Sequence, residues 1–273
     1  MTEARPILFC SDYGLADEFV GVCHAVMARI APEARVINLA HEVPPQDVAR
    51  GAMILASAAK FGPSHAVFLA IVDPGVGTER RPVVVEAGDA TLVGPDNGVL
   101  STAWEVLGGA KRAFRISSSE VVLQPPSNTF HGRDVFAPAA AHLAAGMDPA
   151  KVGDEVEVER LVRVEFPGAR IEVGYVHCKV IGVDRFGNVQ LSARPDDLDE
   201  AGIGGDAVEV RASGHGHRLP RRRTFAEVDR GEGVIVMDSS GYLTVAINHD
   251  RASKKMGMRP GDHVVLAASE TSE

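Results

Sequence analysis

The segment AVFLAIVDPGVGTERR, residues 66–81, joins a continuous apolar run to a polar loop that is rich in glycine. An apolar run of this length, residues 66–72, is typical of a β-strand that is buried on both faces. Asp73 follows the run directly, and open α/β sheets bind their ligands at the carboxyl ends of their strands. The segment therefore predicts a buried strand that leads into a functional loop.

Upstream of this segment, short apolar runs alternate with segments of helical character. The runs that resemble strands are residues 6–10 and 35–39, and the helical segments are residues 17–30 and 44–61. Regular alternation of strands and helices favours a parallel sheet that is covered by helices. The first part of the chain is therefore expected to have an α/β fold.

Downstream, Gly88 and Asp89 separate two short β segments, residues 82–86 and 90–93, in a pattern typical of a hairpin. Because a tight hairpin pairs its strands antiparallel, we expect a mixed, mostly parallel sheet. Residues 134–145 are rich in alanine and are followed by glycine, which predicts a closely packed helix.

After residue 168 the sequence changes to short β segments separated by glycine and aspartate. These segments are residues 172–184, 207–210, 234–237, 242–247 and 263–267. Short strands with such turns predict a small β-barrel with little helix. We therefore expect an N-terminal α/β domain, residues 1–165, with a mixed sheet and flanking helices, and a smaller C-terminal β-barrel domain, residues 166–273.

Composition and charge exclude some classes of function. The formal net charge of -9 over 273 residues argues against binding to the phosphate backbone of nucleic acids. The basic run at residues 218–223 is interpreted as a solvated loop or hairpin edge. Cys10, Cys23 and Cys178 lie in apolar surroundings without a Cys-x-x-Cys pair, which indicates reduced core residues. With no signal region and no apolar stretch of membrane-spanning length, we expect a cytoplasmic protein without membrane contacts.

The loop after residue 72 contains Asp73, Arg80 and Arg81. A carboxylate at this place either faces a cleft or caps a tight turn. The Gly-Val-Gly sequence is a weak signal for a dinucleotide, because Arg80 stands where the third glycine of that fingerprint belongs. Either arginine is able to pair with Asp73 or to orient a bound water, and the spacing does not choose between them.

Two further loops carry candidate groups. His131 precedes the alanine-rich helix, where the helix dipole disfavours the imidazolium ion and keeps the ring neutral. A neutral ring either handles a water or makes only a local hydrogen bond. Asp12 ends the first strand, where it is able to bind ribose hydroxyls or to cap the next helix. Asp96, in the sequence Pro-Asp-Asn-Gly, is interpreted as a turn residue.

The second half of the chain has two polar interruptions, residues 184–188 and 238–242. Phe186 is suited to stack on a base and Asn188 to read the edge of that base, although hairpin turns explain both segments equally well. His215 and His217 lie in a glycine-rich stretch without a third ligand nearby, so a flexible loop is favoured over a metal site there.

Five blocks of sequence together resemble the S-adenosylmethionine hydrolase family, also called SAM hydroxide adenosyltransferases, which is related to the fluorinases and chlorinases. The blocks are SDYG (11–14), VDPGVGT (72–78), PDNG (95–98), TFHGRD (129–134) and FGN (186–188). The resemblance extends from residue 7 to residue 265. Five blocks in the same order are far more specific than any one of them.

The resemblance implies that the protein hydrolyses S-adenosyl-L-methionine to adenosine and L-methionine. It implies that Asp73, Arg80 and His131 handle the attacking water, and so selects Arg80 over Arg81. It also implies a homotrimer, in which the N-terminal domain of one subunit and the C-terminal domain of its neighbour enclose the ligand. The substrate-binding positions that it implies are Asp12, Asp184, Phe186, Asn188, Ser239 and, through the backbone nearby, Asn248.

Two kinds of position distinguish this chain from its wider superfamily. The halogenating members resemble one another in carrying Tyr at the position of Asp73 and Tyr-Ser at the positions of His131 and Gly132. Gly132 offers no hydroxyl group to a halide, and the carboxylate of Asp73 repels one, so water is the expected nucleophile. Four residues depart from the usual family pattern and bear on the methionine contacts more than on the water: Asn38, Ala40, Ser192 and Thr244.

The expected chemistry requires neither a cofactor nor a metal. Attack at C5′ expels methionine as a neutral thioether, so only the water needs help from the protein. Two other readings keep the ligand but change the outcome: an adenosyl sensor without turnover, and a SAM-dependent halogenase. A third reading is a hydrolase of phosphate esters with a divalent metal held by Asp12, Asp73, Asp96 and His131.

Overall fold

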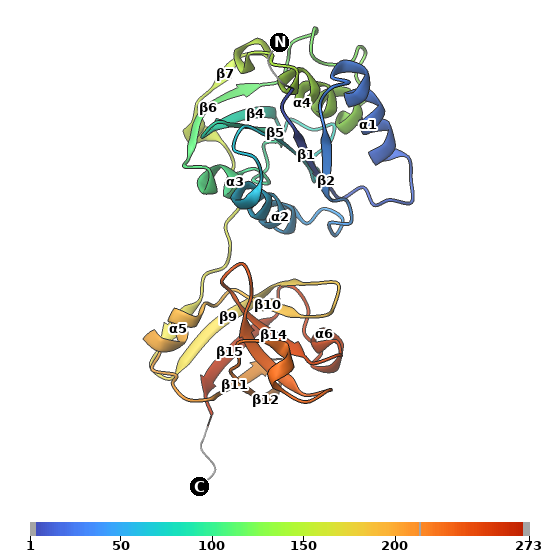
Figure 1. Cartoon of the computed structure of the whole chain (residues 1–273). Helices are drawn as coiled ribbons and strands as arrows, with labels where there is room; N and C mark the ends of the chain where they lie inside the picture. Colours follow the sequence, from blue (N-terminus) through green and yellow to red (C-terminus); the bar gives the residue numbers. More distant parts are fainter. Residues whose placement is uncertain (1–3, 213, 270–273) are drawn as a thin grey trace. The chain divides into compact units, whose positions relative to one another are not determined.

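The computed structural model describes residues 4–212 and 214–269. The chain divides into two compact units, Met1–Glu165 and Phe166–Glu273. The first combines a sheet with helices and the second consists mainly of strands (Figure 1). We call them the N-terminal unit and the C-terminal unit.

The N-terminal unit is built on one mixed sheet. Its strands are β1 (Ile7–Ser11), β2 (Val36–Ala40), β3 (Val67–Ile71), β4 (Pro82–Ala87), β5 (Ala90–Pro95), β6 (Ala110–Arg115) and β7 (Glu155–Val156). They lie in the order β2-β1-β3-β5-β4-β6-β7. The pairs from β2 to β5 are parallel, and those from β5 to β7 are antiparallel. The expected mixed sheet is confirmed, including the hairpin that pairs Ala87 with Ala90.

Helices cover both faces of this sheet. They are α1 (Phe19–Ile30), α2 (Val48–Phe61), α3 (Ser101–Val106) and α4 (Ala137–Ala144). Helices α1 and α4 pack together on one face, and α2 and α3 on the other (Figure 1). In β1, Ile7 and Phe9 belong to the core on the face covered by α1 and α4, whereas Leu8 and Cys10 belong to the core on the face covered by α2 and α3. Burial on both faces explains the continuous apolar run, since each large side chain removed from water contributes about 1.5–3 kcal/mol.

Several elements of the N-terminal unit differ from the expectation. The helix expected over residues 134–145 begins as a π-helical turn, η1 (Gly132–Phe136), and continues as α4. Neither α3 nor β6 was expected, because α3 is short and β6 has three exposed residues among its six. Two short 3₁₀ helices, Pro149–Lys151 and Val158–Arg160, flank β7.

The C-terminal unit is a nearly closed, barrel-like antiparallel sheet, as expected. Its strands are β8 (Arg170–Glu172), β9 (Tyr175–Val183), β10 (Val189–Leu191), β11 (Ala207–Ala212), β12 (His215–Pro220), β13 (Gly233–Met237), β14 (Leu243–Ile247) and β15 (His263–Ala268). They follow the order β12-β11-β15-β9-β10-β14-β13, with β8 paired to β9. A bridge between Arg221 and Ile235 joins the two ends of the sheet.

One expectation about the C-terminal unit is corrected. The stretch that contains His215 and His217 is not a loop but strand β12, which pairs with β11 along its length, so the hairpin-edge reading of the neighbouring arginines is the better one. The described part of the unit has little helix, as expected: α5 (Pro195–Glu200), α6 (Ala252–Lys255) and a 3₁₀ helix, Phe225–Glu227.

Two features of the described residues bear on environment. The three cysteines are free and buried. In the part of the chain that the structure describes, no helix is both long and apolar enough to cross a membrane.

Candidate active site

Two neighbouring strands of the N-terminal unit end at carboxylates. β1 and β3 are parallel neighbours in which Ser11 lies opposite Ile71. Asp12 follows Ser11, its backbone N–H donates to the Ile71 carbonyl oxygen at 3.3 Å, and Asp73 lies two residues beyond Ile71. The carboxyl ends of parallel strands share one edge of the sheet, so both aspartates belong to that edge.

A glycine brings the loop after β3 against the loop before η1. Gly77 has a φ of 76°, and a Cβ at this position would lie 2.6 Å from the carbonyl oxygen of Asn128. Only glycine tolerates both the left-handed backbone and this close approach. Thr78 tightens the same loop, since its hydroxyl donates to the Gly75 carbonyl oxygen at 2.7 Å. The loop that bears Arg80 is thereby held beside the loop that leads to His131.

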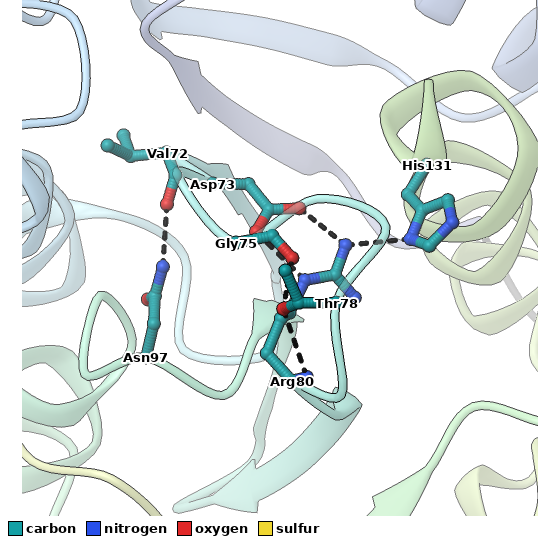
Figure 2. A network of polar contacts seen from close by, with 7 residues as sticks. All are labelled: Val72, Asp73, Gly75, Thr78, Arg80, Asn97 and His131. Atoms are coloured by element: carbon teal, nitrogen blue, oxygen red, sulfur yellow. Dashed lines mark hydrogen bonds and ion pairs between the residues drawn. The ribbon is translucent and has the colours of Figure 1, made fainter. Parts of the chain in front are cut away.

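Asp73, Arg80 and His131 form a continuous network of polar contacts (Figure 2). Arg80 donates from Nε to Asp73 Oδ1 at 2.8 Å and from Nη2 to Asp73 Oδ2 at 2.5 Å. Nη2 also donates to His131 Nδ1 at 2.7 Å. The side chains of Arg80 and Asp73 are only 9% and 7% exposed, so this ion pair is largely withdrawn from water.

The network fixes the protonation of His131. A guanidinium group has donors but no acceptor, so His131 Nδ1 must accept the bond from Arg80 with a lone pair. The ring proton of a neutral imidazole then lies on Nε2, which makes Nε2–H a donor. Burial lowers the pKa of His131, and the positive charge of Arg80 lowers it further. Both influences favour the neutral ring that the helix N-terminus predicts.

The structure separates the two arginines that spacing alone does not distinguish. Arg81 pairs with Asp96 instead, donating from Nε at 2.8 Å and from Nη2 at 2.5 Å to the same carboxylate oxygen. The other Asp96 oxygen accepts from the Val162 backbone N–H at 2.8 Å. Asp96 therefore ties loops together, which agrees with its interpretation as a turn residue.

The neighbouring Asn97 has a structural contact too. Its side-chain nitrogen donates to the carbonyl oxygen of Val72 at 2.8 Å, which anchors the end of β3 (Figure 2). Within residues 4–212 and 214–269, no group of three His, Cys, Asp or Glu side chains is placed to hold a metal ion.

Asp12 is held by a second loop, and a polar network in which Ser11 and His41 are buried lies next to it. Its Oδ2 accepts from the Gln46 backbone N–H at 2.9 Å. The adjacent Ser11 hydroxyl lies 2.8 Å from His41 Nδ1, and His41 Nε2 lies 2.9 Å from Asn38 Oδ1. Burial lowers the pKa of His41 to about 4, with a smaller contribution from His24. This network was not predicted from the sequence, although Asn38 is one of the residues that depart from the usual family pattern.

In the C-terminal unit, the turn between β9 and β10 carries three of the predicted substrate residues. Asp184 accepts from the Asn188 backbone N–H at 2.9 Å and from Asn188 Nδ2 at 2.8 Å. Gly187 has a φ of 86° and packs against Arg251. Phe186 is 75% exposed. The turn is therefore a pinned loop that presents an aromatic ring to its surroundings.

The remaining two predicted residues lie at opposite ends of β14. Ser239 is in the turn before the strand, and Asn248 follows it, with Nδ2 donating to the Val228 carbonyl oxygen at 2.8 Å. A rise of about 3.3 Å per residue separates the ends of this strand by roughly 13 Å. Asn248 lies at the end of β14 that is near the 184–188 turn. Ser253, five residues further along, donates its backbone N–H to the Gly187 carbonyl oxygen in that turn. The structure therefore does not bring Ser239 together with Asn248.

Two of the unusual residues in the C-terminal unit are accounted for by internal contacts. Thr244 is buried and donates to Asp238 Oδ2 at 3.1 Å, and Gln190 Nε2 donates to the same oxygen at 2.5 Å. Ser192 is also buried, and its hydroxyl accepts from the Lys179 backbone N–H at 3.0 Å. Thr244 and Gln190 thus support the turn that contains Ser239, whereas Ser192 ties its own segment to β9. Ala40, the other unusual residue besides Asn38, ends β2.

Comparison with known proteins covers both units. The model of the SAM hydroxide adenosyltransferase N-terminal domain matches residues 7–153, and that of the C-terminal domain matches residues 178–265. A Salinispora tropica protein named (R)-S-adenosyl-L-methionine hydrolase is 45% identical over 96% of this chain and 97% of its own length. A fluorinase from Actinopolyspora mzabensis is 30% identical, with coverage of 97% and 98%.

A solved structure extends the similarity to three dimensions. The crystal structure of an uncharacterized conserved protein from Thermotoga maritima matches with a TM-score of 0.88 and 36% identity, over 96% of this chain and 99% of that one. Since the two domain models together match well over half of the residues, and near full-length relatives are more than 30% identical, this chain belongs to the SAM hydroxide adenosyltransferase family.

Proposed function

We propose that this protein is an S-adenosyl-L-methionine hydrolase that forms adenosine and L-methionine. The observation that carries the proposal is the Asp73–Arg80–His131 network, which offers a buried carboxylate and a neutral imidazole at one edge of the sheet. Relatives at 44–45% identity over nearly the whole chain are named (R)-S-adenosyl-L-methionine hydrolase, which supports the choice of substrate.

The proposed reaction is a displacement at carbon. A water oxygen forms a bond to C5′ of the adenosyl group, while the bond from C5′ to sulfur breaks and its electron pair stays on the sulfur of methionine. The water loses a proton to the protein. The thioether leaves without a proton, so no general acid is needed.

We assign the proton to Asp73 rather than to His131. His131 Nδ1 is occupied by the donor Nη2 of Arg80, and Nε2 already carries the ring proton. His131 is thus placed to donate a hydrogen bond to the water oxygen. Asp73 keeps free lone pairs, because a carboxylate has about four acceptor sites and Arg80 uses two. Arg80 orients both groups and balances the charge of Asp73.

Removal of water from the site favours this chemistry. The nucleophile develops hydroxide character and the substrate is a sulfonium cation, so charge is neutralised as the bond forms. A site with little water supports such a step better than bulk solvent does. The low exposure of Asp73 and Arg80 is consistent with this requirement.

The proposal assigns recognition of the substrate to several other residues. Asp12 would bind the ribose hydroxyls, Phe186 would stack on the adenine, and Asn188 would contact its edge. Asp184 would act through its two bonds to Asn188. Ser239 and the backbone at Asn248 would complete the contacts, and their separation suits an elongated ligand.

We further propose that the protein works as a cytoplasmic homotrimer. Its N-terminal domain, residues 1–165, and the C-terminal domain of a neighbouring subunit, residues 166–273, would form each site. Support comes from Phe186, a large aromatic side chain that is 75% exposed on a pinned turn and is suited to be covered by another surface. The free, buried cysteines agree with a reducing compartment.

One experiment tests the proposed function. The purified protein is incubated with S-adenosyl-L-methionine, and the products are separated by chromatography. Equal amounts of adenosine and methionine are expected. Intact substrate that remains bound would instead make the protein a sensor, and 5′-halo-adenosine formed in halide buffer would make it a halogenase.

A further inference from the structure

The hydroxyl group of Tyr13 occupies the space directly beside Gly132. A Cβ at position 132 would overlap the Tyr13 hydroxyl oxygen and would lie 3.0 Å from Cζ and 3.2 Å from Cε2. Gly132 begins η1 and does not have a positive φ, so its backbone would accept any residue. The reason for glycine at this position is therefore the tyrosine hydroxyl.

The ring of Tyr13 is fixed by other aromatic side chains. It packs against Phe19 with ring centroids 5.6 Å apart, and against Phe130 at 5.8 Å in an edge-to-face arrangement. Phe19 and Phe130 also contact each other at 5.2 Å. Because Tyr13 follows Asp12 in sequence and touches the residue after His131, this cluster places its hydroxyl between the Asp12 loop and the His131 loop.

The hydroxyl of Tyr13 has no hydrogen-bond partner among the residues that the structure describes. Tyr13 is only partly buried, and among the described residues no fully buried side-chain oxygen lacks a partner, so its hydroxyl keeps access to water. Burial raises the pKa of this group, and the negative charges of Asp73 and Asp12 raise it further, so the phenol keeps its proton. A protonated hydroxyl beside the catalytic network is a free donor for a bound oxygen.

We propose that Tyr13 determines the nucleophile: its hydroxyl donates a hydrogen bond to the attacking water and fills the space that a larger oxygen nucleophile would need. This inference rests on the proposed function. The Tyr13 hydroxyl and His131 Nε2–H would both hold the resting water, and transfer of its proton to Asp73 would leave the oxygen a third electron pair, which attacks C5′. Gly132 keeps room for the hydroxyl.

Methanol tests whether Tyr13 limits the size of the nucleophile, because methanol reacts through its oxygen as water does but carries one more carbon. Its oxygen would bond to C5′, the C5′–S bond would break with its electron pair on methionine, and its proton would pass to the same acceptor, giving 5′-O-methyladenosine. In aqueous methanol, Tyr13→Phe should raise the ratio of methyl ether to adenosine about tenfold over the unmodified protein, since the missing oxygen leaves space near the size of a methyl group.

The same variant tests the hydrogen bond. Tyr13→Phe should lower kcat for hydrolysis about tenfold with KM little changed, because the lost donor serves the water and not the substrate. Tyr175→Phe, at an exposed tyrosine of β9, is the matched control and should change neither quantity. A purely structural role for Tyr13 would lower the melting temperature without changing the ratio of products.

The pairing of Tyr13 with Gly132 is tested by a double-mutant cycle. Gly132→Ala should lower kcat strongly when residue 13 is tyrosine and much less when it is phenylalanine, because the worst overlap is with the hydroxyl. Additive effects would refute the pairing, and an unchanged product ratio and kcat in Tyr13→Phe would refute the role in nucleophile choice. If the unmodified protein releases no adenosine, the proposed function itself fails, which is a separate outcome.

Discussion

The two units of the chain present their polar side chains in opposite ways. In the N-terminal unit, Asp73 and Arg80 are less than a tenth exposed and are bonded to each other across a loop. In the C-terminal unit, Asp184 and Asn188 are bonded within one turn, while Phe186 between them is 75% exposed. The network of one unit withdraws charge from water, and the turn of the other presents an aromatic ring to it.

This difference suggests that the two units have different roles. Burial of an ion pair such as Asp73–Arg80 costs free energy, because both charges lose their contact with water. Such pairs are retained where a charge must be held in a fixed place. An exposed aromatic ring on a rigid turn adds contact area for a flat ligand at little cost in conformational entropy. We therefore expect substitutions in the N-terminal network to affect turnover, and substitutions in the C-terminal turn to affect binding.

The largest effect is expected for Asp73→Asn. Loss of the proton acceptor should lower kcat by about 10²–10⁴-fold, the range typical of general bases, with a smaller change in KM. Steady-state release of adenosine measures both. Asp96→Asn is the matched control, because Asp96 is also a buried carboxylate bonded to an arginine. It should lower the melting temperature and leave kcat within about threefold; equal losses of kcat in both variants would contradict these different roles.

A smaller effect, of another kind, is expected for Phe186→Ala. Removal of a base-stacking ring costs about 1–3 kcal/mol, so KM should rise about tenfold or more while kcat changes little. Phe225→Ala, at a second exposed phenylalanine of the same unit, serves as the control and should leave KM unchanged. A fall in kcat at unchanged KM would place Phe186 in the chemical step instead.

Mixed subunits show whether the two units act across a subunit boundary. Asp73→Ala and Phe186→Ala proteins are unfolded together, refolded and assayed well below KM. If each site combines the N-terminal unit of one subunit with the C-terminal unit of another, random assembly of an equal mixture should leave about a quarter of the sites unmodified. Activity near a quarter of the normal value is expected, and no gain over the separate variants would mean that each site lies within one subunit.

The pH dependence of turnover should reflect His131. Its pKa is lowered from 6.5 by burial and by Arg80, and only the neutral ring accepts the bond from Arg80. Turnover should therefore be constant above pH 6.5 and should decline below it, as the pH falls through the lowered pKa. This decline in turnover at low pH should be smaller in His131→Gln. A midpoint at or above pH 6.5 in the unmodified protein would show that the network does not control the ring.

The smallest effect is expected for removal of metal ions. The leaving group needs no Lewis acid, and Arg80 supplies the cation that orients Asp73. Turnover in excess EDTA should therefore equal its value without chelator. Complete loss, with recovery when a divalent metal is added, would replace the proposed mechanism with the metal-dependent one.

Much of the fold follows from local sequence. Strands β1 and β3 are continuous apolar runs because both faces are buried, and the β4–β5 hairpin has the turn residues that such a connection requires. Helix α5 was missed although Pro195 at its start and the acidic residues after it are ordinary start signals. Strand β12 was missed because its glycine and charged residues resemble those of a loop, and its pairing with β11 is a long-range property.

The candidate site was predictable only in part. The positions of Asp12 and Asp73 at strand ends follow from the alternation of elements. The choice of Arg80 over Arg81 depends on which way the loop turns, and that depends on the contact of Gly77 with Asn128, which is distant in sequence. The pairing of Tyr13 with Gly132 is also non-local, and no spacing rule reveals it.

The π-helical turn at Gly132–Phe136 means that the position of His131 depends on the number of residues as well as on their identity. A π turn holds one more residue than an α turn. Deletion of a single residue here would convert it to regular α-helix and would rotate everything before it by about 100° relative to α4. His131 would lose its contact with Arg80 although no residue of the network had been replaced. A one-residue gap at this point in an alignment would therefore mark a homologue whose histidine is out of phase with the arginine.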